Sequence, residues 1–295
     1  MENNFLTYTM KPDWAGIWER GIREAWSNKM VIKHGSIISA WDHASKKHGE
    51  EPETSNRKEL LLKKIAISQS ETVLDIGGGT GAFAIPLANV AKKVTVIEPS
   101  QGMLNKLKDK AGKEKITNIE SICKKWEDVS LDELLELNQG KFDVVLSSHS
   151  LYYITDLHRS FNKMNQACKG TVYLFIGCSD FSRKEAYEKF YLRLYKKPLP
   201  PRPDYCCLYM VLREIGIEPD IEMINIHIKR PIESLEEYVD KWKEYLDVKE
   251  LSGDQKEAIE EYLADKIKEE NGKLYYDYQY KNALIYWRAG DGRSG

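Results

Sequence analysis

Short apolar runs alternate with amphipathic stretches between residues 57 and 178, and this alternation predicts an α/β fold. Five short apolar segments are typical of buried β-strands: 72–76, 93–97, 119–123, 142–146 and 171–176. The stretches between them carry apolar residues at helical spacing, such as Met103, Leu104 and Leu107. Since strand and helix follow one another with short connections, we expect a doubly wound, mostly parallel sheet.

The pattern loosens after residue 178 but still contains helices and strands. Capping-box sequences indicate three helix starts: Ser182, Ser234 and Ser252. We expect the last two of these helices to end near Val248 and Glu270. Two further strand-like segments, 220–229 and 273–287, bring the expected sheet to seven strands.

The N-terminal part of the chain is rich in tryptophan and predicts a helical cap. Two groups of apolar residues recur at helical spacing: Trp14, Ile17, Trp18, Ile22 and Trp26, then Ile37, Ile38 and Trp41. A polar stretch, 46–56, follows as an expected loop. Ordinary packing and a lid that faces the substrate would both require these aromatic residues, so both interpretations stay open.

These patterns divide the chain into four parts. They are the cap 1–56, the core 57–178, a region 179–288 that completes the sheet, and an expected disordered tail 289–295. The third part contains two helical insertions, about 179–212 and 233–272. Ligands of doubly wound folds bind at the carboxyl ends of the strands. We therefore expect the N-terminal cap and both insertions to cover that edge on the substrate side.

Composition narrows the class of protein. The net charge is −2, with 44 basic and 46 acidic residues interspersed, which makes nucleic acid an unlikely partner. No apolar run is long enough to span a membrane, and the N-terminus does not resemble a signal peptide, so we expect a cytoplasmic protein. The five cysteines contain no CxxC pair, so neither a metal site nor a disulfide framework is indicated.

The segment VLDIGGGTG at 73–81 carries the chemistry. Glycines 77, 79 and 81 follow an apolar strand and open a helix, which lets the backbone turn tightly and approach a ligand. A nicotinamide-binding fold could have similar glycines. Asp75, two residues before the first glycine, favours a cofactor with a cationic end and no phosphate. Glu98, at the end of the next strand, can accept hydrogen bonds from ribose hydroxyls in either class.

Four segments resemble, in order and at normal spacing, the motifs of class I S-adenosylmethionine-dependent methyltransferases. They are LDIGGGTGAFAIPLA, VTVIEPSQGML, WEDV and FDVVLSSHSLYYITD. The resemblance covers roughly residues 57–180. It implies a Rossmann-like core, methyltransferase activity and S-adenosyl-L-methionine as cofactor.

The resemblance also implies a set of cofactor-binding residues: Asp75, Gly77, Gly78, Gly79, Glu98, Pro99, Met103, Trp126, Glu127 and Ser147. Glu98 would hold the ribose, and Met103 would form one wall of the adenine pocket. Asp75 would act on the cofactor's ammonium through water, and the backbone carbonyl of Ser147 would accept from it directly. Many relatives place an Asp after the third strand to bind adenine.

Lys125 stands at that aspartate's position in this chain, which is a departure from the family pattern. We therefore expect the backbone or the side chains of Trp126 and Glu127 to contact the adenine. For the Trp126 ring, packing in the core is an equal alternative. On the acceptor side the resemblance offers only two weak catalytic candidates, His149 and Tyr152. A base is needed only when the methyl acceptor arrives protonated.

The acceptor class follows less directly from the sequence. Asn-Pro-Pro-Tyr and Asp-Pro-Pro-Tyr, which mark many enzymes that methylate amino groups of nucleic acids and proteins, are replaced here by Ser-Ser-His-Ser at 147–150. A covered site lined with aromatic residues favours a small-molecule acceptor. The alternatives are a methyltransferase that acts on RNA or a protein side chain, and a non-catalytic partner subunit that binds the cofactor.

Overall fold

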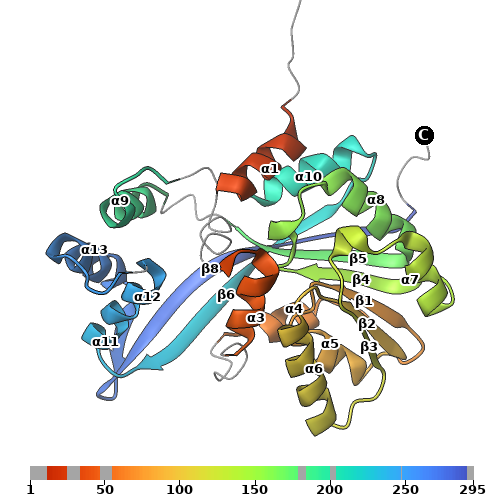
Figure 1. Ribbon diagram of the computed structural model, residues 1–295, viewed down its shortest axis with the longest axis horizontal. Helices are drawn as coiled ribbons and strands as arrows, with labels where there is room; N and C mark the ends of the chain where they lie inside the picture. Colours follow the sequence, from red (N-terminus) through yellow and green to blue (C-terminus); the bar gives the residue numbers. More distant parts are fainter. Residues whose placement is uncertain are drawn as a thin grey trace, which may run out of the picture.

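Helices cover both faces of a central eight-stranded sheet in the computed structural model of the protein (Figure 1). The structure describes residues 12–24, 34–46, 55–178, 184–199, 204–246 and 248–290. The strands are β1 (Thr72–Ile76), β2 (Lys93–Ile97), β3 (Ile119–Ile122), β4 (Phe142–Ser148), β5 (Cys168–Gly177), β6 (Asp220–Ile232), β7 (Ile267–Glu270) and β8 (Lys273–Arg288).

The helices around the sheet come from the whole length of the chain. They are α1 (Trp14–Glu24), α3 (Ile37–Ser45), α4 (Arg57–Leu62), α5 (Ala84–Ala88), α6 (Gln101–Lys113), α7 (Leu131–Asn138), α8 (Leu157–Ala167), α9 (Lys184–Tyr195), α10 (Tyr205–Glu214), α11 (Leu235–Asp240), α12 (Trp242–Leu246) and α13 (Gly253–Leu263). Two 3-10 turns, η1 (Trp126–Asp128) and η2 (Leu151–Tyr153), follow β3 and β4.

The strand order is β3-β2-β1-β4-β5-β8-β6, and β7 pairs with β8. The first five strands of this order are parallel, whereas β8 is antiparallel to β5 and to β6. This arrangement confirms the expected doubly wound, mostly parallel sheet. The order reverses beside β1, and ligand sites of doubly wound folds lie at the carboxyl ends of the strands next to such a point.

The sheet has one strand more than the sequence pattern predicted. Residues 267–270, expected to close a long helix that ends near Glu270, form β7 instead. The helix stops at Leu263, and Asn271 and Gly272 adopt positive φ angles of 50° and 72° between the paired residues Glu270 and Lys273. Asn-Gly is the strongest two-residue hairpin signal. This turn decides against the helix.

Two hydrophobic clusters lie on opposite faces of the sheet. The first contains Trp18 of α1 and Phe161 of α8, and the second contains Phe83 and Leu104 of the α5–α6 side. Neighbouring positions of one strand divide between the clusters, as Leu74 and Val73 of β1 do. The strands are therefore buried on both faces, as parallel strands usually are.

The first insertion belongs partly to this core. Helix α10 packs against α1 and α8, and its residues Leu208, Val211 and Leu212 are fully buried in the first cluster. The apolar face of α10 is therefore covered by α1 and α8. That the insertion covers the substrate side stays a prediction.

The second insertion packs at the outer end of a long β6–β8 hairpin. Gly177, the last residue of β5, pairs with Asn282, so residues 273–281 of β8 extend beyond β5. Helices α9, α11, α12 and α13 gather along this extension in a third hydrophobic cluster that includes Phe190, Tyr238 and Ile259 (Figure 1). The arm so formed continues past the carboxyl edge of the parallel strands.

Several expected features fall at the borders of the described residues. Ser234 and Ser252 cap their helices as predicted, and Ser130 caps α7 in the same way, each accepting from the backbone N–H three residues later. Ser182, Trp26 and most of the 46–56 loop lie outside the described residues, as do residues 291–295 of the expected tail. Ala289, the first residue of the expected tail, is ordered against the sheet, because its N–H donates to the Gly170 carbonyl at 2.8 Å.

Candidate functional site

The glycine-rich loop connects β1 to α5 at the carboxyl edge of the sheet. Its Gly77 and Gly79 have φ angles of 72° and 55°, a left-handed conformation that glycine adopts without strain. A Cβ on Gly77 would lie 2.2 Å from the Cβ of Ser150, whereas a Cβ on Gly79 would meet no atom within 4 Å. The loop is thus closed toward the β4 side and open above Gly79.

Glu98 ends β2 and is bonded to this loop. Its Oε2 accepts from the Gly79 N–H at 3.1 Å, and its Oε1 accepts from the Ser100 N–H at 2.9 Å. The carboxylate is 7% exposed. Burial raises the pKa of Glu98, the two backbone donors oppose that effect, and the nearby Asp42 adds to it. The loop and the acid are therefore held together by hydrogen bonds. The predicted role of Glu98 as the ribose ligand stays a prediction.

Asp75, two residues before the loop, is a buried carboxyl group that no positive charge among the described residues stabilises. It is 2% exposed, and its Oδ2 has no hydrogen-bond partner. Burial, followed by the charge of Glu98, raises the pKa of Asp75 to about 7. A Cβ on Gly78 would come within 2.8 Å of that oxygen, so Gly78 leaves it room. A buried carboxylate of this kind is matched by a cationic ligand.

The end of β4 is fixed to the loop by two serines. The Ser150 hydroxyl donates to the Ile76 carbonyl at 2.6 Å and lies 2.6 Å from the Ser147 hydroxyl. Ser147 itself is fully buried. Its backbone is thereby held next to the carboxyl end of β1, where the sequence placed the cofactor's ammonium.

The remaining predicted cofactor residues lie around β2 and β3. Pro99 is partly exposed, and Met103, in the first turn of α6, is 3% exposed. The Ser100 hydroxyl accepts from the Met103 N–H at 3.1 Å, which fixes this turn beside Glu98. Glu127 is partly exposed on η1. Pro99, Met103 and Glu127 surround the carboxyl ends of β2 and β3, and their contact with a cofactor stays a prediction.

Trp126 is buried in the first hydrophobic cluster at 3% exposure. Lys163 of α8 lies 3.9 Å from the centre of its ring and donates to the carbonyls of Trp126 and Val129. The Trp126 ring therefore exposes little surface with which it could contact adenine. Sequence reasoning missed Lys163, because a lysine on an amphipathic helix normally faces solvent.

The acceptor-side candidates come together where β4 and β5 end beside the middle of β8. His149 has a positive φ of 55°, and its Nε2 lies 2.9 Å from Nδ2 of Asn282. The Tyr152 hydroxyl accepts from the Gly177 N–H at 3.0 Å. Burial lowers the pKa of His149 to about 3, so its imidazole is neutral at physiological pH. Asn282, which the sequence did not single out, is fully buried and its Oδ1 has no partner.

Helix α3 covers the β2 side of the site. Asp42 Oδ1 accepts from the Ser100 hydroxyl at 2.6 Å and from the Gly102 N–H at 2.9 Å, so it caps α6 from another segment. Trp41 meets the ring of Tyr153 edge-on at 5.9 Å, and the charge of Glu98 acts on Tyr153. The N-terminal segment thus lies over the cofactor residues, whereas α1 packs against α10 as ordinary core.

We expect Asp42→Ala to loosen α3 and to raise the dissociation rate of S-adenosylhomocysteine several-fold. The substitution removes two hydrogen bonds to a carboxylate at a helix N-terminus, each worth roughly 1–2 kcal/mol. Stopped-flow displacement would measure the rate. Asp109→Ala, at an exposed position of the same helix α6, serves as the control. Equal dissociation rates for both variants would show that α3 does not hold the cofactor.

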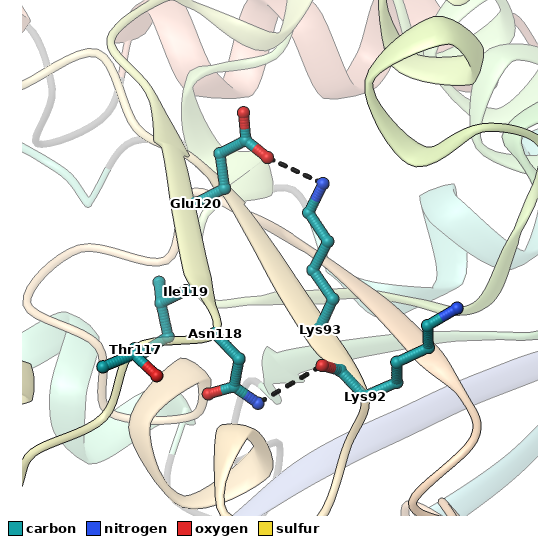
Figure 2. A pocket seen from close by; sticks show the side chains of 6 residues that line it. All are labelled: Lys92, Lys93, Thr117, Asn118, Ile119 and Glu120. Atoms are coloured by element: carbon teal, nitrogen blue, oxygen red, sulfur yellow. Dashed lines mark hydrogen bonds and ion pairs between the residues drawn. The ribbon is translucent and has the colours of Figure 1, made fainter.

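A shallow hollow of about 340 Å³ lies elsewhere on the sheet (Figure 2). Its lining residues are Lys92, Lys93, Thr117, Asn118, Ile119 and Glu120. Lys93 pairs with Glu120 at 2.7 Å, and Asn118 donates to the Lys92 carbonyl. These residues stand at the amino ends of β2 and β3, whereas the glycine loop follows a carboxyl end. The hollow is therefore not part of the candidate site.

A parallel sheet that carries a glycine loop, a buried acid before the loop and a second acid after the next strand defines a class I S-adenosylmethionine-dependent methyltransferase core. Comparison with known proteins gives the same class. Residues 74–176 match the family model described as a methyltransferase domain, so this part of the chain belongs to that family. Among the described residues, no helix is long and apolar enough to cross a membrane.

Two curated relatives and one solved structure illustrate the likeness. A protein of Methanosphaera stadtmanae named "Probable ribosomal RNA small subunit methyltransferase A" is 38% identical over 93 residues, which are 32% of this chain and 31% of that protein. Malonyl-[acyl-carrier protein] O-methyltransferase of Geobacter sulfurreducens is 32% identical over 91 residues, 30% of this chain and 31% of that protein. The chain thus spans about a third of the length of either relative.

The solved structure is the YcgJ protein of Bacillus subtilis. It superimposes with a TM-score of 0.54 at 14% identity, over 81% of this chain and 98% of that chain. At this identity the likeness shows the fold. The structural likeness confirms the Rossmann-like fold, and the family match identifies residues 74–176 as a methyltransferase domain.

Glu98→Gln should weaken the binding of S-adenosylhomocysteine by roughly 1–3 kcal/mol. Both carboxylate oxygens accept backbone N–H groups, so an amide would direct one of its own N–H groups at a donor and disturb the loop. The same change also removes an acceptor for ribose hydroxyls. Calorimetry measures the affinity, with Glu120→Gln in the remote hollow as the control. An unchanged dissociation constant would place the ribose away from Glu98.

Proposed function

We propose that this protein transfers a methyl group from S-adenosylmethionine to a small-molecule acceptor. The observation that carries the proposal is the pair of buried carboxylates, Asp75 and Glu98, on either side of the glycine loop. Both have raised pKa values, so their surroundings lack positive charge. A cofactor with an ammonium and a ribose would satisfy both groups, whereas a phosphate would be repelled.

The residues of this chain would position the two reactants. Asp75 and the Ser147 backbone would hold the amino-acid end of the cofactor, and Glu98 would hold its ribose. S-adenosylmethionine supplies a methyl group on a positively charged sulfur, and the acceptor's lone pair displaces that sulfur in line. Such a reaction needs alignment more than covalent help, and alignment can contribute roughly 7–11 kcal/mol.

His149 fits a positioning role at the acceptor better than the role of a strong base. Its pKa of about 3 means that a proton taken by the buried ring would be held weakly. Its neutral ring, held by Asn282, can still orient an acceptor by hydrogen bonding. Tyr152 lies 6.2 Å from the His149 ring centre to centre and is stacked on the buried Trp18, so it forms a fixed wall.

A small molecule suits these surroundings. The acceptor side contains a few buried or half-buried polar groups, the side chains of His149, Tyr152 and Asn282. Hydrogen bonds fix each of them, which is typical of sites that recognise compact ligands. Trp18 fixes η2 in place, because its indole N–H donates to the Ile154 carbonyl at 2.9 Å. Methyl transfer to ribosomal RNA is the second candidate, favoured by the likeness to the Methanosphaera stadtmanae protein.

Incubation with S-adenosylmethionine labelled in the methyl group tests the proposal. The full-length protein is mixed with a cell extract separated into small molecules, RNA and protein, and the label in each fraction is counted. We expect label among the small molecules. Label in RNA or in protein would replace this proposal by the macromolecular alternative. A protein that binds S-adenosylhomocysteine but labels no fraction would be a non-catalytic partner subunit.

A further inference from the structure

Arg57, the first residue of α4, is placed beside the acceptor-side residues by contacts distant in sequence. Ser55 forms an isolated bridge with Ile228 of β6. The next residue, Asn56, donates its N–H to the His227 carbonyl at 3.2 Å and accepts the His227 N–H on its side chain at 2.9 Å. These bonds fix the start of α4 against the edge strand of the sheet.

The Arg57 side chain reaches β8 from this position. Burial raises the pKa of Tyr280, and the nearby guanidinium of Arg57 opposes this effect. Tyr280 lies two residues before Asn282 on the same strand and on the same face. Tyr280 is stacked on Tyr278 at 6.1 Å, which holds the ring in place. The charge of Arg57 also acts on His149, whose pKa it lowers after the larger effect of burial.

Arg57 carries a charge that the described residues do not neutralise. Within the described ranges, no Asp or Glu side chain forms an ion pair with it, although the residue is half-buried. A guanidinium has five N–H donors, and their planar arrangement matches carboxylate and phosphate oxygens. The local charge is therefore suited to an anion.

Three polar groups of the acceptor side surround Gly177, the last residue of β5. Gly177 has no side chain, and a Cβ there would stand 3.4 Å from the Tyr152 hydroxyl and 3.9 Å from both the Asn282 Oδ1 and the His149 ring. Three polar groups thus converge on a position that a side chain would fill. Asn282 Oδ1, fully buried and without a partner, is an acceptor that a bound molecule can satisfy.

We propose that Arg57 and Asn282 recognise a small-molecule acceptor that bears a carboxylate or a phosphate ester. This inference rests on the proposed function, because it names the class of acceptor for the same site. Arg57 binds the anionic group, and Asn282 Oδ1 accepts from an N–H or O–H of the acceptor. His149 and Tyr152 border the part of the molecule between these two contacts.

Labelled methyl transfer to a small-molecule extract, divided by anion exchange into anionic and other molecules, tests this inference. Calorimetry with S-adenosylhomocysteine comes first, because a protein that does not bind it would contradict the proposed function itself. With binding established, we expect label in the anionic fraction. Treatment of that fraction with alkaline phosphatase before the assay distinguishes the two anions: lost labelling indicates a phosphate ester, and retained labelling indicates a carboxylate.

The variants Arg57→Gln and Arg57→Lys identify the residue responsible. Arg57→Gln should lower kcat/KM for the labelled anionic acceptor at least about tenfold, mainly through KM, since a charged hydrogen bond is lost. Arg57→Lys should restore part of it. Both variants should bind S-adenosylhomocysteine as the wild type does. Arg213→Gln, at an exposed arginine that faces Glu218, controls for loss of a charge.

Three outcomes would overturn the inference while leaving cofactor binding intact. The first is label only in neutral, cationic or macromolecular fractions, and the second is label in no fraction. The third is a labelled anionic acceptor for which Arg57→Gln and Arg213→Gln have the same kcat/KM as the wild type.

Discussion

Gly79→Val is expected to abolish the binding of S-adenosylhomocysteine while the protein stays folded. Gly79 has a φ of 55°, and its N–H donates to Glu98. A β-branched residue in this left-handed conformation is strained, so the loop would shift and the bond to Glu98 would be lost. A side chain at this position would also project into the open side of the loop, where the ligand approaches. Calorimetry measures binding, and thermal unfolding confirms the fold.

Gly112→Val is the matched control for this experiment. Gly112 lies in α6, its Cβ position is also free of atoms within 4 Å, and its φ is not positive. The same substitution there adds the same bulk without backbone strain and away from the loop. We expect wild-type affinity for Gly112→Val. Wild-type affinity for a folded Gly79→Val protein would locate the ligand elsewhere.

The parallel core could be predicted from the sequence because its strands are apolar on both faces. The segments 72–76 and 93–97 became β1 and β2 with the predicted ends, and the glycine loop followed β1 as its motif required. Local physics decides these features, since a buried strand and a tight glycine turn each leave a continuous signal in the chain.

The acceptor side could be predicted only in part. His149 and Tyr152 follow a recognisable strand, whereas Asn282 and Arg57 are brought to them by pairing between β5, β8 and the segment before α4. An asparagine within a β segment and an arginine at a helix start have no distinctive pattern of their own. Contacts between residues so far apart in the sequence depend on the order of the strands in the sheet. The spacing of apolar residues along the chain does not predict that order.

The missed β7 strand and the buried Trp126 have different causes. The turn signal Asn271-Gly272 is present in the sequence. The prediction of a helix up to Glu270 rested on the capping box at its start and did not take this turn into account. For Trp126 the sequence could not tell a cofactor contact from core packing, because both need a large apolar ring. Only the position of Lys163 over that ring shows which side faces the protein interior.

Asp75→Asn is expected to stabilise the free protein and to weaken cofactor binding at the same time. The folded-state pKa of Asp75 is about 7, above the ordinary value of 3.8, because burial and Glu98 disfavour its charge. A raised pKa means that the folded protein binds the proton more tightly than the unfolded chain does. The stability from this group is therefore complete below about pH 4 and is lost as the pH rises to about 7.

The size of the effect follows from the shift. A difference of about 3 pKa units corresponds to on the order of 4 kcal/mol by pH 8. Asparagine carries no charge, so Asp75→Asn should unfold at higher denaturant concentration than the wild type, by more at pH 8 than at pH 5. Asp143→Asn is the contrasting control. Burial raises the pKa of Asp143, but bonds from Thr72 and Lys169 outweigh this effect and lower it, so loss of this charge should destabilise the protein.

Cofactor binding should respond in the opposite direction. The charged form of Asp75 is the one that attracts an ammonium, so the wild-type affinity for S-adenosylhomocysteine should rise between pH 6 and pH 8 as Asp75 loses its proton. In Asp75→Asn the affinity should be lower, and this rise should disappear. Calorimetry at both pH values, beside denaturant unfolding at pH 5 and pH 8, measures the two effects in the same variant. A variant that is less stable than the wild type at pH 8 would show that the charge of Asp75 is stabilised in the folded protein. A variant that keeps the rise in affinity would show that Asp75 is not the partner of the ammonium.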